Sequence, residues 1–407
     1  MSEEVFKARL EPSGREFSLY PGESILNSAL RQRILLQYGC RNGRCSSCKY
    51  FLIDGEVDFG KVSPYSLSEN EKEEGWALLC QARALSDLTI RDQDISDRDD
   101  APVLTPRDET AEISAIEQLT ESLWALQLVL PHPLIFYPGQ FIEIEAPGRP
   151  GSWRCYSIAS SAANPERIDL VVKRIAGGKF SGQVERLARG SRLAVRGPYG
   201  MSYLRDSDRP VLLVATGSGL APLLSIMRSS AEQRDPRSFQ LYYGARTAAD
   251  LIFRDELYSM EQRLPHFRFK PSLSAPAATD SSPASPGPAA ATSAPSSAAP
   301  DHSRALANPS PTSAGSSAAA DPSLAPMGPT GAYPERSRTV PNPSPATLSR
   351  VSVGRVTQAL QRDITDTSPY DAYICGHPDM CESVATLLLA KGIPEDRIFR
   401  DDFYPAV

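Results

Sequence analysis

The sequence predicts a multidomain α+β protein, because its pattern changes character twice along the chain. Two short alternating runs joined by a tight turn open the chain, which is typical of a small β-rich unit. From about residue 107 to 205, strand follows strand with turn residues between them, which indicates an antiparallel β-barrel. From residue 209 a continuous apolar run leads into a glycine-rich turn and a helix, which predicts a doubly wound α/β domain.

The composition excludes several classes of protein. The chain has 407 residues, enough for two or three domains, and no run of 18 or more apolar residues, so we expect no membrane span. Acidic residues near the N-terminus are unlike a signal peptide, which predicts a cytoplasmic location. A net charge of −6 argues against nucleic acid as a partner. Residues 1–100 hold 18 acidic and 13 basic side chains, which fits either a docking surface for a basic partner or an ordinary solvated face.

The first unit is expected to span residues 1–92. Its runs VFKARLEP and REFSLYP flank a Pro-Ser-Gly turn, which predicts a hairpin over residues 5–21. A helix is expected from about residue 23 to 33, and a strand over KYFLI follows a cysteine-bearing loop. Residues 93–106 are acidic at the start and lack an apolar period, so they are interpreted as a linker.

The second and third units are expected at residues 107–205 and 206–407. The barrel strands are AEISAIEQL, LWALQLVL, QFIEIEA, CYSIA, IDLVVKRI and RLAVRGP, and the buried parallel strands are VLLVAT, FQLYYGAR and YDAYICG. Residues 275–346 interrupt the third unit and consist almost entirely of Ala, Pro, Ser, Gly and Thr. Such a segment cannot offset its ordering entropy, so we expect a disordered surface insertion without a catalytic part. A spacer or partner-binding segment is the alternative.

Four cysteines have the spacing of an iron–sulfur site. They are Cys40, Cys45, Cys48 and Cys80, arranged as C-x4-C-x2-C with the fourth 31 residues beyond the third. This is the plant-type [2Fe–2S] spacing, whereas a zinc site normally has two short C-x2-C pairs or added histidines. The small residues in GCRNGRCSSC allow backbone N–H groups to point at the sulfurs. The first 92 residues resemble a plant-type ferredoxin domain, which implies a β-grasp fold and a low-potential one-electron carrier.

The second unit contains three notable segments in order: RCYS (154–157), the run VVKRIAGGKFSGQV and GPYG (197–200). In this order they resemble the flavin domain of the ferredoxin–NADP reductase family. By that resemblance, Arg154 pairs with a cofactor phosphate, for which its planar fork is suited, and Tyr156 packs against the flavin. Ser157 is implied to hydrogen-bond near flavin N5, and Gly178 and Ser181 to cradle the pyrophosphate. The backbone N–H groups of the turn favour phosphate oxygens as well.

The third unit carries the nucleotide motifs of the same family. The turn TGSGLAP departs from G-x-G-x-x-G because proline replaces the third glycine. The resemblance assigns the turn to the pyridine nucleotide through Thr216, Gly217, Gly219 and Pro222. Arg246 follows the next strand, where it contacts the adenosine end or is an ordinary surface arginine. The later segment YICGHPDM resembles the family's C-G-x-P-x-M segment, which implies that Gly376 binds nucleotide and that Cys375 lies close to the nicotinamide ring in a positional role.

The chain ends in DDFYPAV, and the reductases that it resembles end in an aromatic residue that covers the flavin ring. By resemblance, Phe403 is the expected covering residue, with Tyr404 as its rival. Ser274 and Arg355 flank the insertion, which puts their part as ligand contacts in doubt. We interpret Cys155 and Cys381 as packing residues and assign His377 no role.

Apart from the insertion, the chain resembles the three-domain reductases of bacterial aromatic-ring-hydroxylating dioxygenases and multicomponent monooxygenases. This implies an NAD(P)H-dependent iron–sulfur flavoprotein that passes a hydride to FAD and single electrons to its [2Fe–2S] cluster. The acceptor is then an oxygenase or a separate ferredoxin component, and we expect a monomer that binds neither nucleic acid nor membrane. NADH is favoured over NADPH because no cluster of basic residues marks a 2′-phosphate site. The alternatives are a reductase for a deoxysugar-forming iron–sulfur enzyme and an electron carrier without nucleotide-dependent activity.

Overall fold

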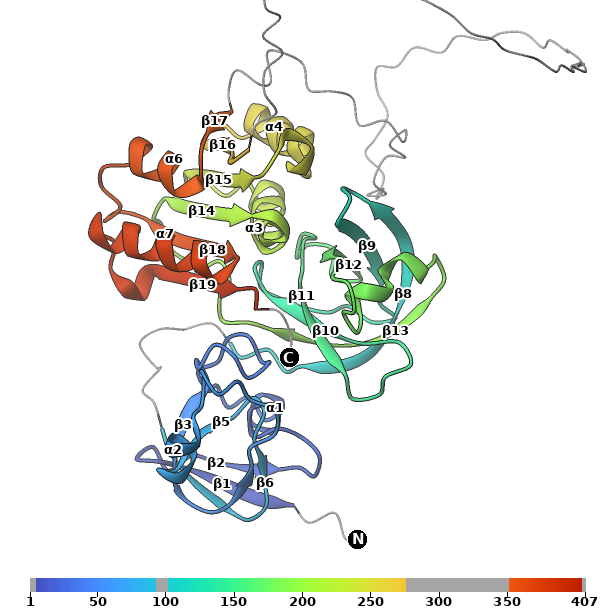
Figure 1. Cartoon of the computed structure of the whole chain (residues 1–407), viewed down its shortest axis with the longest axis vertical. Helices are drawn as coiled ribbons and strands as arrows, with labels where there is room; N and C mark the ends of the chain where they lie inside the picture. Colours follow the sequence, from blue (N-terminus) through green and yellow to red (C-terminus); the bar gives the residue numbers. More distant parts are fainter. Residues whose placement is uncertain (1–4, 93–101, 276–350, 405–407) are drawn as a thin grey trace, which may run out of the picture. The chain divides into compact units, whose positions relative to one another are not determined.

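The computed structural model describes residues 5–92, 102–275 and 351–404. Each of the three expected units contains a β-sheet of the expected kind (Figure 1). Most of the predicted linker at 93–106, and the predicted insertion at 275–346 except for Ala275, lie outside the described residues. The unit boundaries remain predictions.

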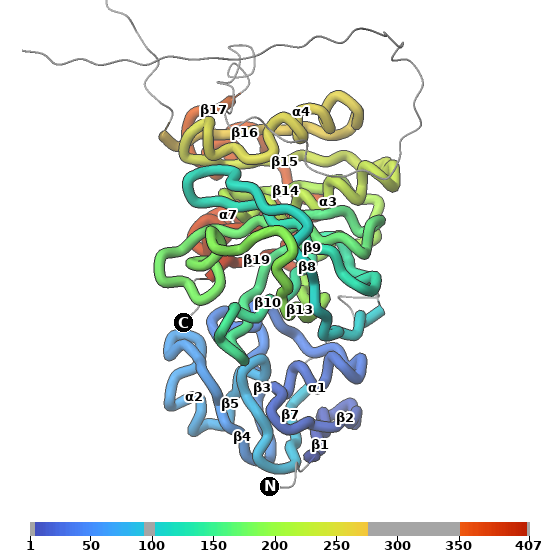
Figure 2. The backbone as a smooth tube through the Cα atoms, turned by 90° about the vertical axis from the view of Figure 1, so that its right-hand side faces the viewer, coloured from blue at the N-terminus to red at the C-terminus, as the bar shows by residue number. Residues whose placement is uncertain are grey.

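The first sheet has the strand order β2-β1-β7-β3-β5. Its strands are β1 (Phe6–Glu11), β2 (Glu16–Leu19), β3 (Lys49–Asp54), β5 (Trp76–Leu78) and β7 (Leu88–Arg91); β4 (Val57–Asp58) and β6 (Arg83–Ala84) form a small second sheet. The first and last strands of this unit, β1 and β7, pair in parallel at the centre of the sheet, and the helix α1 (Ile25–Arg31) packs against the sheet as in a β-grasp fold (Figure 2). A shorter helix, α2 (Glu69–Glu73), lies before β5.

Helix α1 is shorter than the expected 23–33 for local reasons. Ser24 caps its start by accepting a hydrogen bond from the Asn27 backbone N–H. The helix ends before Arg33, whose φ of +60° lies in the left-handed region. All residues from Ile25 to Leu30 are buried, because the helix packs on the first sheet, which contains the hairpin β1–β2.

The second sheet forms the expected barrel, with the order β11-β10-β13-β8-β9-β12. Its strands are β8 (Arg107–Gln118), β9 (Leu123–Val129), β10 (Phe141–Glu145), β11 (Trp153–Ser157), β12 (Arg167–Lys173) and β13 (Arg192–Tyr199). An isolated bridge between Ile158 and Leu170 connects the ends of the two edge strands. Buried aliphatic residues fill the interior together with Phe180 from the turn after β12.

The third sheet is entirely parallel, with the order β17-β16-β15-β14-β18-β19. Its strands are β14 (Val211–Thr216), β15 (Phe239–Ala245), β16 (Phe267–Leu273), β17 (Ser352–Val353), β18 (Asp371–Gly376) and β19 (Ile398–Asp402). Helices α3 (Leu220–Gln233) and α4 (Arg254–Arg263) cover one face, and α6 (Val356–Asp363) and α7 (Pro378–Ala390) cover the other (Figure 1). The strand order reverses at β14, which is where α/β sheets place their ligands.

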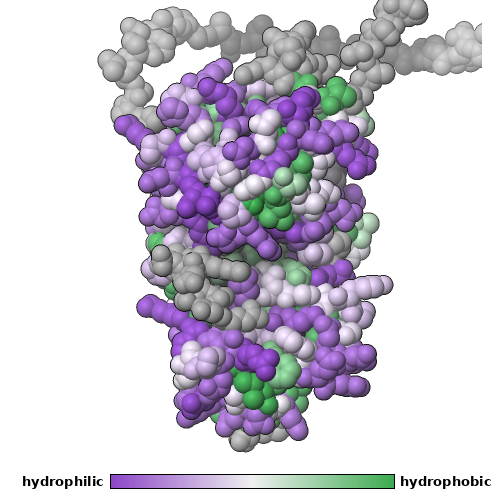
Figure 3. Space-filling model, turned by 90° about the vertical axis from the view of Figure 1, so that its left-hand side faces the viewer, coloured by the Kyte–Doolittle hydropathy of each residue, from purple (hydrophilic) through white to green (hydrophobic). Residues whose placement is uncertain are grey.

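Among residues 5–92, 102–275 and 351–404, none of the helices combines the length and the apolar character that a membrane crossing requires. The face shown in Figure 3 is mainly hydrophilic and interrupted by small hydrophobic spots. Single exposed apolar side chains of this kind are normal on a protein surface.

Candidate functional site

The four candidate ligand cysteines lie in two hydrogen-bonded pairs. Cys40 pairs with Cys45, and Cys48 pairs with Cys80. These bonds lower the pKa of Cys45 to about 6 and that of Cys80 below its usual value. Over the part of the chain that the structure describes, no group of three His, Cys, Asp or Glu side chains has the arrangement needed to hold a single metal ion. Two thiol pairs suit a cluster in which each of two irons takes two thiolates.

The loop around these cysteines is tightly wrapped and rich in donors. A Cβ on Gly39 would lie 3.1 Å from the Cys45 sulfur, and one on Gly43 would lie 2.7 Å from the Lys61 carbonyl oxygen. The Ser47 hydroxyl and backbone N–H both hydrogen-bond to Cys45, as expected for a loop of small residues. Two side-chain nitrogens of the buried Arg41, Nε and Nη1, have no partner among the described residues. Unsatisfied cationic donors in this loop fit an anionic cluster held by thiolates.

A cavity of about 1250 Å³ brings most of the other candidate residues together. Single small-molecule sites usually measure roughly 300–1,000 Å³, so this one has room for more than one ligand. The candidates that line it are Arg154, Tyr156, Ser157, Gly178, Ser181, Thr216, Gly217, Arg246, Gly376 and Phe403. Cys40 also lines it, so the cavity reaches the cysteine loop.

The flavin segments meet on one wall of this cavity. Strand β11 presents Arg154, Tyr156 and Ser157, and the 3-10 helix η2 (Ser181–Arg186) begins at the glycine turn opposite. The Tyr156 ring lies 5.1 Å from the Phe180 ring, centroid to centroid, and Ser181 hydrogen-bonds to Tyr156. A Cβ on Gly178 would lie only 2.4 Å from the Ser181 hydroxyl oxygen, so this turn accepts no larger residue without moving. An aromatic ring beside a donor-rich turn and an arginine fits a flavin nucleotide.

Asp401 is a cavity residue that the sequence analysis missed. It lies on β19, and its Oδ2 accepts a hydrogen bond of 3.3 Å from the Ser157 hydroxyl. Burial, together with the charge of Asp402, raises the pKa of Asp401 to about 7. A carboxyl group that holds its proton near neutral pH therefore contacts the candidate flavin-binding serine.

Some of the nucleotide candidates line the cavity, and the others lie behind the lining residues. Thr216 and Gly217 at the end of β14, and Gly376 at the end of β18, line the cavity. Gly219 and Pro222 do not; a Cβ on Gly219 would lie 2.2 Å from the Cys375 carbonyl oxygen. Gly219 thus permits close packing of the turn on β18, as glycines of such turns do.

Cys375 is buried beneath the cavity and is not among its lining residues. Burial raises the pKa of this thiol well above its usual value, so it is an inert thiol at neutral pH. Its closeness to the nicotinamide stays a prediction, and the structure supports a positional role only.

The C-terminal residues and the flanks of the insertion reach the same cavity. Phe403 donates its backbone N–H to the Gly376 carbonyl at 2.8 Å, and both Phe403 and Tyr404 line the cavity. Ser274 and Arg355 line it too, because β16 and β17 pair directly across the insertion. The doubt over these two residues arose because the insertion splits the loop that carries them, and the pairing of β16 with β17 brings the two flanks together. Their part as ligand contacts stays a prediction.

Three family models match the chain in the same order. The 2Fe-2S iron-sulfur cluster binding domain matches residues 8–85, the oxidoreductase FAD-binding domain matches residues 110–203, and the oxidoreductase NAD-binding domain matches residues 213–284. The fold and site therefore define an NAD(P)H-dependent iron–sulfur flavoprotein oxidoreductase.

Similar proteins narrow the class to a family. The reductase component of propane 2-monooxygenase from Gordonia sp. (strain TY-5) is 36% identical over 288 residues, which cover 69% of this chain and 81% of that one. The reductase component of phenol 2-monooxygenase from Pseudomonas sp. (strain CF600) is 32% identical, over 66% of this chain and 76% of that one. The solved Amycolatopsis cytochrome P450 reductase GcoB is 28% identical with a TM-score of 0.74, over 99% of this chain and 100% of that one.

This chain belongs to the family of reductase components of bacterial oxygenases. It transfers electrons from NAD(P)H through FAD to a [2Fe–2S] cluster.

Proposed function

We propose that this reductase delivers its electrons to the oxygenase component of a multicomponent oxygenase. The observation that carries the proposal is the shared cavity, because the flavin strand, the nucleotide turn and Cys40 of the cluster loop all line it. We infer the class of acceptor from the relatives of this chain. They are named as reductase components of monooxygenases that act on an alkane, propane, and on an aromatic compound, phenol. Aromatic hydrocarbon catabolism is thus the metabolic setting we propose, in the cytoplasm.

Each wall of the cavity has a part in this function. Bound FAD accepts a hydride from NAD(P)H and gives up single electrons to the cluster. Arg154 holds a phosphate of the flavin, and Gly178 and Ser181 present the turn that faces the pyrophosphate. Ser157 orients the flavin edge and shares its hydroxyl proton with Asp401 Oδ2. Cys40, Cys45, Cys48 and Cys80 hold the two irons.

Phe403 is the proposed cover of the flavin ring, and Thr216, Gly217 and Gly376 receive the nicotinamide end of the nucleotide. A backbone hydrogen bond from Phe403 to the Gly376 carbonyl holds this aromatic residue beside the proposed nicotinamide site, which supports its role as the cover.

NADH is the proposed nucleotide. Arg246 and Arg355 both line the cavity, and each could attract a 2′-phosphate. Asp250 lines it as well, 4.0 Å from Arg246, and a carboxylate there accepts from ribose hydroxyls and repels a phosphate. The kcat/KM values for the two nucleotides, measured side by side, decide between them.

An anaerobic titration of the purified protein with NADH tests the electron path. We expect the flavin absorption to bleach and an EPR signal of a reduced [2Fe–2S] cluster to appear. Flavin reduction without a cluster signal would contradict the assignment of the cysteines. Transfer to the acceptor is tested by adding the oxygenase component encoded beside this reductase and measuring NADH-dependent product formation; a neighbouring set of sugar-nucleotide enzymes would favour a deoxysugar-forming acceptor instead.

A further inference from the structure

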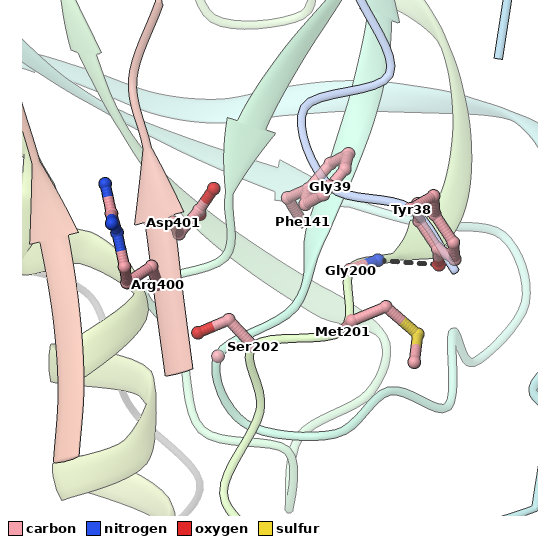
Figure 4. Close-up of a pocket in the computed structure, with 9 residues that line it drawn as sticks. Tyr38, Gly39, Phe141, Gly200, Met201, Ser202, Arg400 and Asp401 are labelled. Atoms are coloured by element: carbon pink, nitrogen blue, oxygen red, sulfur yellow. Dashed lines mark hydrogen bonds between the residues drawn. The ribbon is translucent and has the colours of Figure 1, made fainter. Parts of the chain in front are cut away.

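The loop that carries Cys40 is packed directly on the flavin-binding barrel. Phe141 and Tyr199 of the barrel belong to the same buried apolar cluster as the core of the β-grasp sheet. The Tyr38 hydroxyl accepts a hydrogen bond of 2.9 Å from the Gly200 backbone N–H, next to Gly39 and Phe141 (Figure 4). This hydrogen bond therefore holds the start of the loop against the barrel, two residues before Cys40, the first candidate ligand.

An ion pair holds the same loop one residue beyond that ligand. Arg41 Nη2 lies 3.1 Å from Glu143 Oε2 on β10, and the two side chains are 3% and 5% exposed. The Arg41 guanidinium also stacks 3.6 Å above the centre of the Tyr199 ring and donates to Asn27 of α1. Burial would raise the pKa of Glu143, but Arg41 and Arg196 outweigh it and keep the carboxylate ionised.

The flavin strand contacts the cluster loop as well. The Cys155 thiol, between Arg154 and Tyr156 on β11, lies 3.5 Å from the Cys40 carbonyl oxygen and 3.7 Å from Glu143 Oε1. Strand β11 pairs with β10 residue by residue, and Cys155 lies opposite Glu143 in that register. The carboxylate that binds Arg41 is thus one strand away from the residues proposed to bind flavin.

A buried ion pair is an expensive way to join two surfaces. Because removing two charges from water often costs more than their attraction returns, apolar residues of the same size would commonly be as stable. What a forked guanidinium supplies is a defined geometry, since its donors fix both distance and orientation.

We propose that Arg41, through its buried pair with Glu143, is a positioning residue that fixes the cluster loop on β10, beside the flavin strand, and so sets the rate of flavin-to-cluster electron transfer. The inference rests on the proposed function, and it adds a residue that contacts neither nucleotide nor substrate. In the reaction, FAD bound in the cavity would take a hydride from NADH, leaving NAD⁺, and would pass the two electrons on singly. Each electron would reduce one ferric iron of the cluster, which would return to the ferric state by reducing the external acceptor before the second electron arrives. One proton is released to water for each NADH oxidised.

The test compares two arginines that bind the same carboxylate. Arg41→Gln removes the contact between the cluster loop and Glu143 of the barrel. Arg196→Gln removes a contact inside the barrel, where Arg196 Nε lies 2.7 Å from Glu143 Oε2. Stopped-flow absorption follows flavin reduction and cluster reduction separately in the complete protein. We expect NADH to reduce the flavin at the normal rate in both variants, and Arg41→Gln to slow cluster reduction severalfold, because electron transfer weakens as the separation of the two cofactors grows. Arg196→Gln should stay within about twofold of the native rate.

Two further measurements separate geometry from charge and from loss of folding. Arg41→Lys keeps the charge and loses the fork, so it should leave the cluster potential unchanged and still slow the transfer. Hydrogen–deuterium exchange on the complete protein with its cofactors bound should show faster exchange of residues 39–48 in Arg41→Gln than in Arg196→Gln. Native transfer rates in both Arg41 variants, or equal slowing by Arg196→Gln, would overturn the proposal. Failure of NADH to reduce the flavin of the native protein would overturn the proposed function instead.

Discussion

Replacement of Gly219 by alanine tests how the nucleotide turn is supported. The added Cβ would lie 2.2 Å from the Cys375 carbonyl oxygen, 2.6 Å from its carbon and 2.8 Å from the Gly376 Cα. All three are backbone atoms of β18, which lies inside the sheet between β14 and β19. The clash therefore cannot be relieved by rotating a side chain, and the turn must separate from the strand.

The expected magnitude is that of overpacking against the backbone, about 1–3 kcal/mol. Gly219 is the N-cap of α3, a position at which glycine is preferred over alanine, so helix propensity supplies no compensating gain. This loss corresponds to a fall of about 2–12 °C in the midpoint of thermal unfolding. Because Thr216 and Gly376 face each other across this contact, kcat/KM for NADH should fall by on the order of 10- to 100-fold.

The assay is a thermal unfolding scan of the variant beside Ser218→Ala, which changes the neighbouring residue without adding a Cβ. Steady-state reduction of ferricyanide, which can accept electrons from the flavin, gives the NADH kinetics. An unfolding midpoint for Gly219→Ala equal to that of Ser218→Ala, with native kinetics, would refute the steric argument.

Three other predictions concern the cofactors and a titrating group. Cys45→Ala should abolish the visible and EPR signals of the cluster while ferricyanide reduction continues, and Cys381→Ala, in a residue buried away from the loop, should keep the signals. Arg154→Ala should weaken FAD retention by about 10- to 100-fold, the equivalent of one charged hydrogen bond of about 1.5–3 kcal/mol; the exposed Arg149→Ala is the control in an equilibrium dialysis measurement. Asp401 has a folded pKa raised from 3.8 to about 7, so the folded chain binds the proton more tightly than the unfolded chain. Its contribution to stability is complete below pH 3.8 and is lost as the pH rises through about 7. Asp401→Asn should therefore reduce the dependence of the thermal unfolding midpoint on pH between these two values.

Contrary outcomes are equally definite. A normal cluster spectrum in Cys45→Ala would remove that residue from the ligand set. Equal loss of FAD from Arg149→Ala would reduce the role of Arg154 to general positive charge. An unchanged pH dependence in Asp401→Asn would mean that the carboxyl group titrates normally in the folded protein.

Local patterns in the sequence were sufficient for most of the fold. The alternation in VFKARLEP and REFSLYP produced a hairpin, and the apolar run VLLVAT produced a buried parallel strand, because burial on one or both faces is written in such patterns. The cysteine spacing and the RCYS segment indicated the cofactors for the same reason, since their residues are neighbours in the chain.

Contacts between distant segments carry no such local signal. Arg41 and Glu143 are 102 residues apart, and Ser157 and Asp401 are 244 apart. Glu143 sits in the strand sequence FIEIE, where alternation predicts an exposed glutamate, yet it is buried. Arg196 inside the barrel and Arg41 from the first unit together stabilise the charge at that position. For the same reason, the sequence did not reveal that Gly219 and Cys375 support the cavity from beneath.

The direct pairing of β16 with β17 also makes the chain a convenient scaffold. Ser272 lies opposite Ser352, and the Gly354 backbone N–H donates to the Leu273 carbonyl at 2.8 Å, so the strand edge is complete on both sides of residues 276–350. Because the cost of closing a loop grows only slowly with its length, whatever joins these two strands can be exchanged. A fluorescent reporter or an electron-accepting protein inserted at this position would begin and end beside Ser274 and Arg355, which line the nucleotide cavity. An inserted electron acceptor would then receive electrons within the same chain.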